Sequence, residues 1–379
     1  MTGSMQFIDL KVQQERIRPQ LDEAIKRVLD HGQYIMGPEV AKLESMLVEF
    51  VGVKHAIACS SGTHALLLPL MAYGIGPGDA VITTPFTFFA SCEMIALTGA
   101  TPVFVDIDPE TFNIDPAKIE AVIASIKAEG RFNLKGIMPV DLFGLPADYD
   151  LIMKIAEEYT LFVFEDATQA FGATYKGRRA PGLAHVGATS FFPAKPLGCY
   201  GDGGAVFTDD DQLASTIRSL LVHGKGSDKY NNALIGLNAR MDTLQAAILI
   251  EKLTIFPEEL ELRQRVVNRY EEAIDSDEEN YFGVTAPLVN PDCTSVWAQY
   301  TVSCKRRDEL QAKLRQDGIP TMVYYQKPMH FFDALRYLGY QEGDFPVAEN
   351  ACHTVLSLPF HPYLKTNDQL RIIMGICES

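Results

Sequence analysis

The sequence lacks the features that mark many secreted, membrane-bound and metal-binding proteins. No apolar run approaches the roughly 20 residues that a membrane-spanning helix needs, and no secretory signal is evident where the chain begins. The seven cysteines are odd in number and include no CxxC pair, which argues against a disulfide framework and against a zinc site. We therefore expect a cytoplasmic protein with reduced thiols, no membrane partner and no metal.

Basic residues are also few. The chain has 33 Lys and Arg against 49 Asp and Glu, so its formal net charge is −16. A positive field that would attract nucleic acid is therefore missing, and an anionic ligand must be bound by a local site. No GxGxxG fingerprint follows a predicted strand and opens a helix, so the sequence does not support an NAD-linked enzyme.

The length of the chain allows more than one core. With 379 residues, 47% of them hydrophobic, two domains are expected. A long helical pattern begins near residue 240, and Pro257 is expected to interrupt it and to mark the boundary. We predict a large domain over residues 1–256 and a smaller α+β domain over residues 257–379. Strand-like segments of the second domain lie at residues 300–302 and 322–324.

Short apolar segments alternate with helical patterns through the first domain. This alternation is typical of a mostly parallel sheet covered by helices on both faces, so the expected fold class is α/β. In such sheets, ligands bind beyond the carboxyl ends of the strands. The expected strands are residues 55–59, 81–83, 102–105, 136–140, 161–164 and 205–208, and the expected helices are 62–72, 89–97, 115–127 and 147–159.

A carboxylate and a lysine stand at the ends of buried strands. The apolar run 161–164 ends in Glu165 and Asp166, and residues 189–194 lead Lys195 into a glycine-rich turn. A pyridoxal phosphate (PLP) enzyme requires such a pair, because the lysine forms a Schiff base with the cofactor and the carboxylate keeps the pyridine nitrogen protonated. Taken singly, a helix N-cap explains Asp166 better and a solvated loop lysine explains Lys195 better. Together, they favour the cofactor site.

Neighbouring strand ends carry further candidates. Residues 60–63 (Ser-Ser-Gly-Thr) join a strand to a helix and offer free backbone N–H groups to a phosphate, although an ordinary N-cap fits equally well. Phe88 could stack on a planar cofactor or belong to the core. Ser190 could donate to a phosphate. Gln169 could reach the cofactor hydroxyl from one turn beyond Asp166, or be a solvated amide.

Several segments resemble motifs of the DegT/DnrJ/EryC1/StrS family of sugar aminotransferases. Residues 165–173 resemble its EDAAQ-type motif, and residues 190–198 resemble its Schiff-base lysine motif. Further matches lie at residues 32–38, 61–63, 223–224 and 238–242. The matches fall in order and span about residues 5–370.

The resemblance implies the aspartate aminotransferase fold (PLP fold type I), PLP as the cofactor, and a homodimer with shared active sites. By match to the motifs, Lys195 is the Schiff-base lysine and Asp166 the pyridinium partner. The remaining cofactor positions are Gly62, Thr63 and Ser190 on the phosphate, Phe88 on the ring face, Gln169 near the ring hydroxyl, and Asn238 reaching the phosphate from the partner subunit. His223 and Arg240 match positions near the substrate, although a core role for His223 and a surface salt bridge for Arg240 stay open.

The resemblance also implies a substrate class. L-Glutamate is the expected amino donor, and ping-pong kinetics are expected. Residues 192–204 are most similar to enzymes that aminate C3 of UDP-2-acetamido-2-deoxy-3-oxo-glucuronate in bacterial surface-polysaccharide synthesis, such as that of lipopolysaccharide O-antigen. A dTDP-3-keto-6-deoxyhexose is an alternative. A UDP-4-keto sugar is less favoured, because the histidine-rich segment that C4 enzymes often carry after the lysine is absent.

One departure weakens the uronate assignment. Close relatives often have a His-Tyr pair where this chain has Tyr324 and Tyr325. Both tyrosines are candidate substrate contacts, but a tyrosine cannot offer a cationic imidazolium to a carboxylate. Lys327 or His330 could supply that charge instead. The alternative is that the two tyrosines are strand residues divided between core and surface.

Two other activities use the same fold. A PLP-dependent sugar dehydratase would carry histidine in place of the lysine, and Lys195 argues against it. A regulator that binds PLP without turnover would keep the fold and lose parts of the site, whereas every expected cofactor position is filled here. The non-catalytic regulator stays as the alternative from a different functional class.

Overall fold

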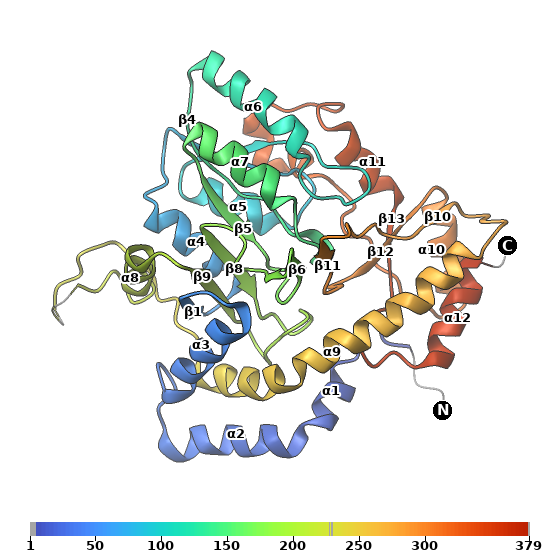
Figure 1. The fold of residues 1–379 in the computed structure, drawn as a ribbon, viewed down its shortest axis with the longest axis horizontal. Helices are drawn as coiled ribbons and strands as arrows, with labels where there is room; N and C mark the ends of the chain where they lie inside the picture. The colour runs from blue at the N-terminus through green and yellow to red at the C-terminus, as the bar shows by residue number, and fades with distance from the viewer. Residues whose placement is uncertain (1–4, 227, 229, 378–379) are drawn as a thin grey trace.

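The computed structural model describes residues 5–226, 228 and 230–377, so the first four and last two residues of the expected domains lie outside the described part. Figure 1 shows a central sheet flanked by helices and joined through one long helix, α9, to a smaller unit that contains the C-terminal strands.

A seven-stranded sheet forms the centre of the large unit. Its order is β1-β9-β8-β5-β4-β2-β3. β9 pairs antiparallel with both of its neighbours, and the remaining pairs are parallel. The mostly parallel α/β sheet predicted from the sequence is therefore confirmed. The bounds are β1 (His55–Cys59), β2 (Asp79–Thr83), β3 (Thr101–Phe104), β4 (Asn133–Ile137), β5 (Phe162–Asp166), β8 (Val186–Ser190) and β9 (Gly204–Thr208).

Helices cover both faces of this sheet. Side chains of a strand alternate between faces, so Phe164 packs with one layer while its neighbour Val163 packs with the other. The first layer contains α4 (Gly62–Ala72), α5 (Phe89–Leu97) and α8 (Asp211–Leu220). The second contains α6 (Pro116–Glu129) and α7 (Tyr149–Tyr159) beside β2 to β5, and α3 (Pro38–Val51) with the start of α9 beside β1 and β9.

The long helix α9 (Thr243–Asp275) links the two units. Its first half packs on α2 (Arg18–His31) through Ala247 and Ile248, with α1 (Leu10–Arg16) preceding α2. Its second half buries Val267 and Tyr270 in the core of the smaller unit. The expectation that Pro257 interrupts the helix is wrong, because α9 continues through this residue. Each half of α9 packs against a separate core, and this packing offsets the loss of the backbone hydrogen bond that a proline cannot donate. The division at residue 257 stays a prediction.

The smaller unit is built on a three-stranded antiparallel sheet, β10-β12-β13. The strands are β10 (Val284–Thr285), β12 (Tyr300–Cys304) and β13 (Val355–Leu358), and the helices are α10 (Arg307–Gln316), α11 (Pro346–Thr354) and α12 (Thr366–Cys377). The strand expected at residues 322–324 reduces to a single bridge between Met322 and Ser357. Short elements complete the fold: β6 (Thr174–Tyr175), β7 (Arg178–Arg179), β11 (Cys293–Thr294), η1 (Leu142–Gly144), η2 (Met329–Phe331) and η3 (Asp333–Leu338).

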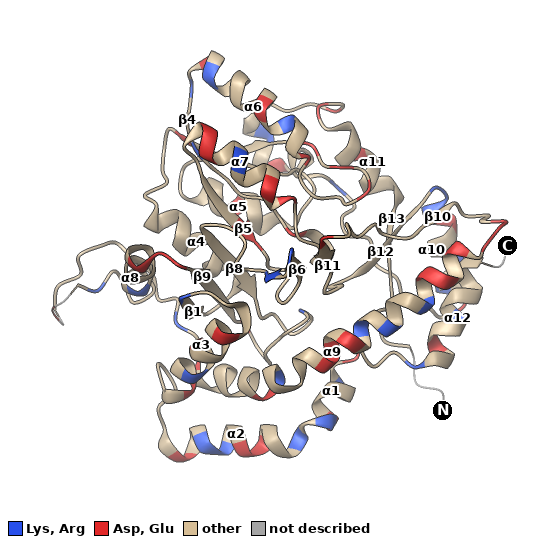
Figure 2. Cartoon of the chain, viewed as in Figure 1, with Lys and Arg blue, Asp and Glu red and all other residues tan. Residues whose placement is uncertain are grey.

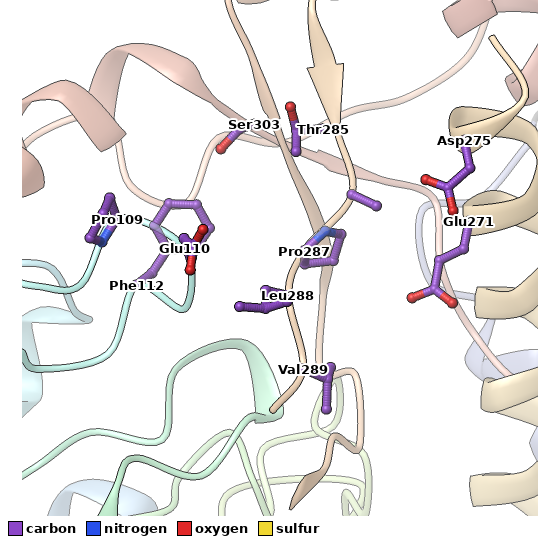
Figure 3. Close-up of a pocket in the computed structure, with 11 residues that line it drawn as sticks. Pro109, Glu110, Phe112, Glu271, Asp275, Thr285, Pro287, Leu288, Val289 and Ser303 are labelled. Carbon is purple, nitrogen blue, oxygen red and sulfur yellow. The ribbon is translucent and has the colours of Figure 1, made fainter. Parts of the chain in front are cut away.

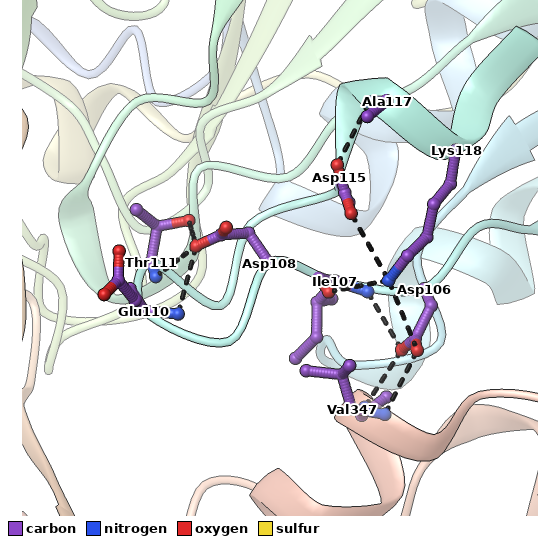
Figure 4. A network of polar contacts seen from close by, with 10 residues as sticks. Asp106, Ile107, Asp108, Glu110, Thr111, Asp115, Ala117, Lys118 and Val347 are labelled. Carbon is purple, nitrogen blue, oxygen red and sulfur yellow. Dashed lines mark hydrogen bonds and ion pairs between the residues drawn. The ribbon is translucent and has the colours of Figure 1, made fainter.

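A buried carboxylate joins the large unit to α11. Asp106, after β3, accepts hydrogen bonds from the backbone N–H groups of Val347 (3.1 Å) and Ala348 (2.9 Å), as Figure 4 shows. These N–H groups belong to the first turn of α11 and have no partner within the helix. Lys118 lies 3.6 Å from the same carboxylate. Asp106 therefore serves as an N-terminal cap supplied from another unit.

The charges are interspersed. Figure 2 shows acidic and basic residues interspersed along α2 and α9 rather than a separate basic stripe. In the described part of the chain, no helix is long and apolar enough to cross a membrane.

Candidate active site

Asp166 and Lys195 lie at the same edge of the central sheet. β5 ends at Asp166, the neighbouring strand β8 ends at Ser190, and the turn between β8 and β9 carries Lys195. The turn is closed by hydrogen bonds from Phe191 N to Gly203 O and from Cys199 N to Phe191 O, both 2.8 Å. A Cβ at Gly198 would lie 2.5 Å from the Phe192 carbonyl oxygen, so the tight turn requires glycine there.

The Asp166 carboxylate is buried and held by two donors. The Ser91 hydroxyl donates to Oδ2 at 2.6 Å, and the Thr168 backbone N–H donates to Oδ1 at 3.2 Å. Burial raises the pKa of Asp166, while these hydrogen bonds and the charge of Lys195 oppose that increase. Sequence reasoning missed Ser91. Its place in the first turn of α5, three residues after Phe88, was the only signal that could have suggested it.

The Lys195 amine has an unusually low affinity for its proton. Its side chain is partly exposed, but the protein packed around the amine removes enough water to lower its pKa to about 8, against the attraction of Asp166. No hydrogen bond to its Nζ is found among the described residues. Lys195 therefore presents an amine that is partly neutral near physiological pH, as a nucleophile and a proton carrier require.

A helix N-terminus faces the end of β8. α4 begins at Gly62, and its N-cap Ser61 accepts a hydrogen bond from His64 N at 3.1 Å. A Cβ at Gly62 would lie 2.6 Å from Ser190 Cβ, so glycine permits this close approach. Thr63 is exposed beside it, and Ser190 Oγ accepts from Phe192 N at 3.3 Å. The free N–H groups and hydroxyls together form an anion-binding arrangement.

Gln169 is buried and contacts two other segments. Its Oε1 accepts from Phe143 N at 2.9 Å, and its Nε2 donates to the Tyr325 hydroxyl at 3.0 Å. The interpretation as a solvated amide is therefore wrong. Tyr325 packs edge-on against Phe86, and burial raises its pKa. Phe88 is 57% exposed, so the core interpretation does not hold for it either.

The structure does not bring every candidate to this edge. His330 is buried, with its Nε2 3.0 Å from Glu349, and packs on Phe345, so it faces the core that lies between the two units. Tyr324 packs edge-on against Tyr325, with ring centroids 5.8 Å apart, and against Phe7 at 6.5 Å, so it is one residue removed from the contact with Gln169. Lys327 is exposed, with its Nζ over the ring of Phe332 at 5.1 Å.

Of the candidates after α8, His223 and Asn238 are exposed and Arg240 is half-buried. His223 is exposed rather than in the core, and its backbone has a φ of 62°. Arg240 donates to Asn238 Oδ1 from Nε at 3.0 Å and from an η nitrogen at 2.7 Å, whereas no salt bridge of Arg240 is found in the described part. A guanidinium only donates, so this contact fixes the amide and leaves the Asn238 Nδ2 free to donate outward.

The residues present fit PLP. A buried carboxylate can bind a protonated ring nitrogen, a desolvated lysine stands opposite it, and the start of α4 can bind a phosphate. No group of three or more His, Cys, Asp or Glu able to hold a metal ion occurs among the described residues.

A separate cavity of about 570 Å³ lies between the units, shown in Figure 3. Glu110 lines it from the large unit, and Glu271 and Asp275 project toward it from α9. Its lining contains no Lys or Arg, so it does not suit a phosphate group. It includes neither Asp166 nor Lys195.

Comparison with known proteins gives consistent matches along the whole chain. The sequence profile of the DegT/DnrJ/EryC1/StrS aminotransferase family matches residues 15–377. A UDP-2-acetamido-2-deoxy-3-oxo-D-glucuronate aminotransferase of Pseudomonas aeruginosa is 49% identical over 362 residues, covering 96% of each chain. A pleiotropic regulatory protein of Geobacillus stearothermophilus is 42% identical, covering 98% of this chain and 97% of the relative. The solved structure of a DegT DnrJ EryC1 StrS aminotransferase from Brucella abortus superposes with a TM-score of 0.94 at 50% identity, covering 98% of each chain.

Proposed function

The chain belongs to the DegT/DnrJ/EryC1/StrS aminotransferase family, and from this premise we propose that it transfers an amino group from L-glutamate to C3 of a UDP-linked 3-keto-N-acetylhexosamine or its uronate. It has PLP fold type I and is a PLP-dependent aminotransferase. The observation that carries the proposal is the placement of buried Asp166 and the low-pKa Lys195 at one edge of the sheet.

The roles of the site residues are part of this proposal. PLP, when bound, supplies an aldehyde for amine exchange and a ring that stabilises negative charge. Asp166 binds the ring nitrogen and keeps its proton, with Ser91 holding the carboxylate. Lys195 would hold the aldehyde carbon, and its partly neutral amine would take a proton from the α-carbon of the donor. The phosphate is bound by Gly62, Thr63 and Ser190. This contact takes the charged end of the cofactor out of water and fixes the position of its ring.

Three further contacts complete the proposed cofactor site. Phe88 offers an exposed aromatic face to the ring, and Gln169 lies between Tyr325 and the turn at Phe143, where it can support the ring hydroxyl. Asn238 of a second copy of the chain reaches the phosphate with the Nδ2 that Arg240 leaves free.

The 49% identical relative supports the C3 uronate, since its name specifies a 3-oxo glucuronate derivative. The burial of His330 against Glu349 weakens it, because that imidazole is not exposed to receive a carboxylate. Arg240, His223 and Tyr324 stay as proposed substrate contacts. A dTDP-3-keto-6-deoxyhexose or a UDP-4-keto sugar are the alternative acceptors.

We also propose that the enzyme is a homodimer with shared sites, working in the cytoplasm in the synthesis of a surface polysaccharide such as lipopolysaccharide O-antigen. Exposed large apolar side chains support the dimer, because consecutive ones seldom stand on a monomer surface without a partner. Three of them are consecutive, Tyr34, Ile35 and Met36, and Ile235 is 91% exposed.

A non-catalytic regulator is the second candidate, favoured by the name of the 42% identical relative. Binding of PLP alone does not separate the two candidates. The separating experiment incubates PLP-loaded protein with L-glutamate and measures 2-oxoglutarate by mass spectrometry. One equivalent of 2-oxoglutarate per site supports the aminotransferase; none, from protein that has bound PLP, supports the regulator.

A further inference from the structure

Two buried carboxyl groups lie directly behind Asp166 and take no part in the chemistry described above. Glu165 precedes Asp166 on β5, and Asp141 lies beside that strand end, where its backbone N–H donates to Asp166 O at 3.0 Å. Neither residue is exposed. Because successive side chains of a strand point to opposite faces, Glu165 projects away from the face that carries Ser91 and Asp166.

Each of the two carboxyl groups has one oxygen bonded and one oxygen without a conventional donor. Asp141 Oδ1 accepts from Ala147 N and from the Tyr149 hydroxyl, both at 2.9 Å, and Glu165 Oε2 accepts from Leu183 N at 2.7 Å. Asp141 Oδ2 and Glu165 Oε1 are buried and have no conventional hydrogen-bond donor among the described residues. The two carboxyl groups are close enough for each to shift the pKa of the other. Two carboxylates only accept, so a hydrogen bond between them requires a proton.

We propose that Asp141 and Glu165 share one proton and act as a positioning pair for the cofactor site. Glu165 donates through this proton to Asp141 Oδ2, and the pair carries a single negative charge. All buried oxygens of the two groups are then satisfied.

The charges around the pair agree with a retained proton. The groups that face it are Tyr149 from α7, Cys293 from β11 and Asp166, and the pKa of each is raised. Among the described residues, no Lys, Arg or His bonds to either carboxyl group. Burial raises the pKa of Asp141 to about 7 and that of Glu165 well above its usual range.

The pair reaches the cofactor site through a short turn. Asp141 closes the turn 141–147 by accepting from Ala147 N, and this turn places Phe143 N on Gln169 Oε1. Asp141 N also holds the end of β5 at Asp166. The connection to cofactor binding rests on the proposed function, whereas the shared proton does not.

The first test measures the melting temperature of cofactor-free protein against pH. A raised folded-state pKa means that the stabilisation is fully present below the unfolded pKa and is lost as pH rises through the folded pKa. Glu165→Gln keeps one donor and one acceptor but cannot lose a proton. As pH rises from about 5 to about 9, the parent protein should lose stability that Glu165→Gln keeps. The melting temperature of Glu165→Gln minus that of the parent protein should therefore increase by about 2–6 °C over this range. Parallel curves over this range would overturn the shared proton.

A double-mutant cycle gives a second test. In Asp141→Asn, the new amide donates to Glu165, so each single variant keeps a bonded pair. In the double variant two amide NH2 groups face each other, because Ala147, Tyr149 and Leu183 claim both amide oxygens. We expect the double variant to be much less stable than the sum of the singles predicts. Additive melting temperatures would overturn the contact.

The positioning role is tested by PLP affinity in a fluorescence titration. We expect the double variant to bind PLP at least about tenfold more weakly, as loss of one to two hydrogen bonds implies. Asp106→Asn is the matched control, because it destabilises the protein at the α11 cap, outside the proposed cofactor site. Its affinity for PLP should be unchanged. If both lose affinity equally, the pair is merely structural. If the melting curves behave as expected while the parent protein binds no PLP, the proposed function fails and the shared proton stands.

Discussion

At the scale of single residues, the site depends on two groups that shift each other's protonation. The charge of Asp166 raises the pKa of Lys195, but burial dominates and leaves it at about 8. The Lys195 charge lowers the pKa of Asp166, again against burial. For the amine, the balance gives the partly neutral form that PLP chemistry requires, and for the carboxylate, Lys195 and the hydrogen bonds of Ser91 and Thr168 favour the ionised form against burial.

Lys195→Ala should lower transamination at least about 10³-fold, because one side chain serves as both nucleophile and proton carrier. The free energy of unfolding should change by less than about 1 kcal/mol, since the amine makes no hydrogen bond that the fold needs. Steady-state assay and thermal melting measure the two quantities. Lys11→Ala on α1 is the control for loss of an exposed lysine. An active Lys195→Ala protein would contradict the assigned role.

The rate of PLP capture should rise with pH and level off above about 8, because the neutral amine is the reactive form. Capture is followed by borohydride trapping and mass spectrometry of the peptide that contains Lys195. Asp166→Asn removes a charge that raises the lysine pKa, so its midpoint should move to lower pH. A midpoint near that of a free lysine, about 10.4, would contradict the low pKa.

Ser91→Ala should weaken PLP binding by about 5- to 100-fold, as expected for a hydrogen bond to a charged group. The pKa of Asp166 should rise, so on acidification the loss of affinity should begin at a higher pH than in the parent protein. Ser45→Ala removes a serine whose hydroxyl bonds only the Ala41 carbonyl and should bind PLP normally. Equal affinity of the two variants would exclude Ser91 as the residue that holds Asp166.

Residue types at strand ends predicted Asp166 and Lys195 as a pair, because the two together favour a cofactor site although each alone has a more ordinary explanation. Ser91 and Asp141 could not be predicted in this way. Each acts through a hydrogen bond between segments that are distant in sequence, and neither has a distinctive local pattern. The exposed pairing of Asn238 with Arg240 was likewise invisible before the fold placed them.

At the scale of elements, periodicity predicted strand and helix positions well where the segments are buried on both sides. β1, α4 and α5 begin and end at the predicted residues. Prediction failed where tertiary packing overrides local preference. α9 passes through Pro257 because two cores hold its halves, and residues 322–324 form one bridge rather than a strand.

The cap on α11 is an element-scale contact that joins the two units (Figure 4). Asp106→Asn replaces an accepting oxygen with a donor that faces a backbone N–H, which should destabilise the protein by about 1–2 kcal/mol. Lys118→Met, which removes only the partly exposed cation, should cost less than about 1 kcal/mol. Urea denaturation measures both. An equal cost for the two variants would show that the ion pair, not the cap, joins the units.

At the scale of the whole molecule, the proposed shared sites make activity depend on association. Lys195→Ala and Asn238→Ala subunits, mixed, dissociated and reassociated, should regain activity at limiting PLP. A mixed dimer has one site with both residues intact, while either variant alone has none. The assay follows 2-oxoglutarate before and after mixing. No recovery in verified mixed dimers would place Asn238 in the same subunit's site or outside it.

The central claim, that this chain aminates a nucleotide-linked keto sugar, is tested most directly by one absorbance series. PLP is added to purified protein, then L-glutamate, then in turn UDP- and dTDP-linked 3-keto and 4-keto sugars. We predict that glutamate removes the near-visible band of the bound cofactor, and that a UDP-linked 3-keto sugar restores it with formation of the amino sugar. A band that glutamate leaves unchanged, or that no keto sugar restores after glutamate has removed it, would contradict the account.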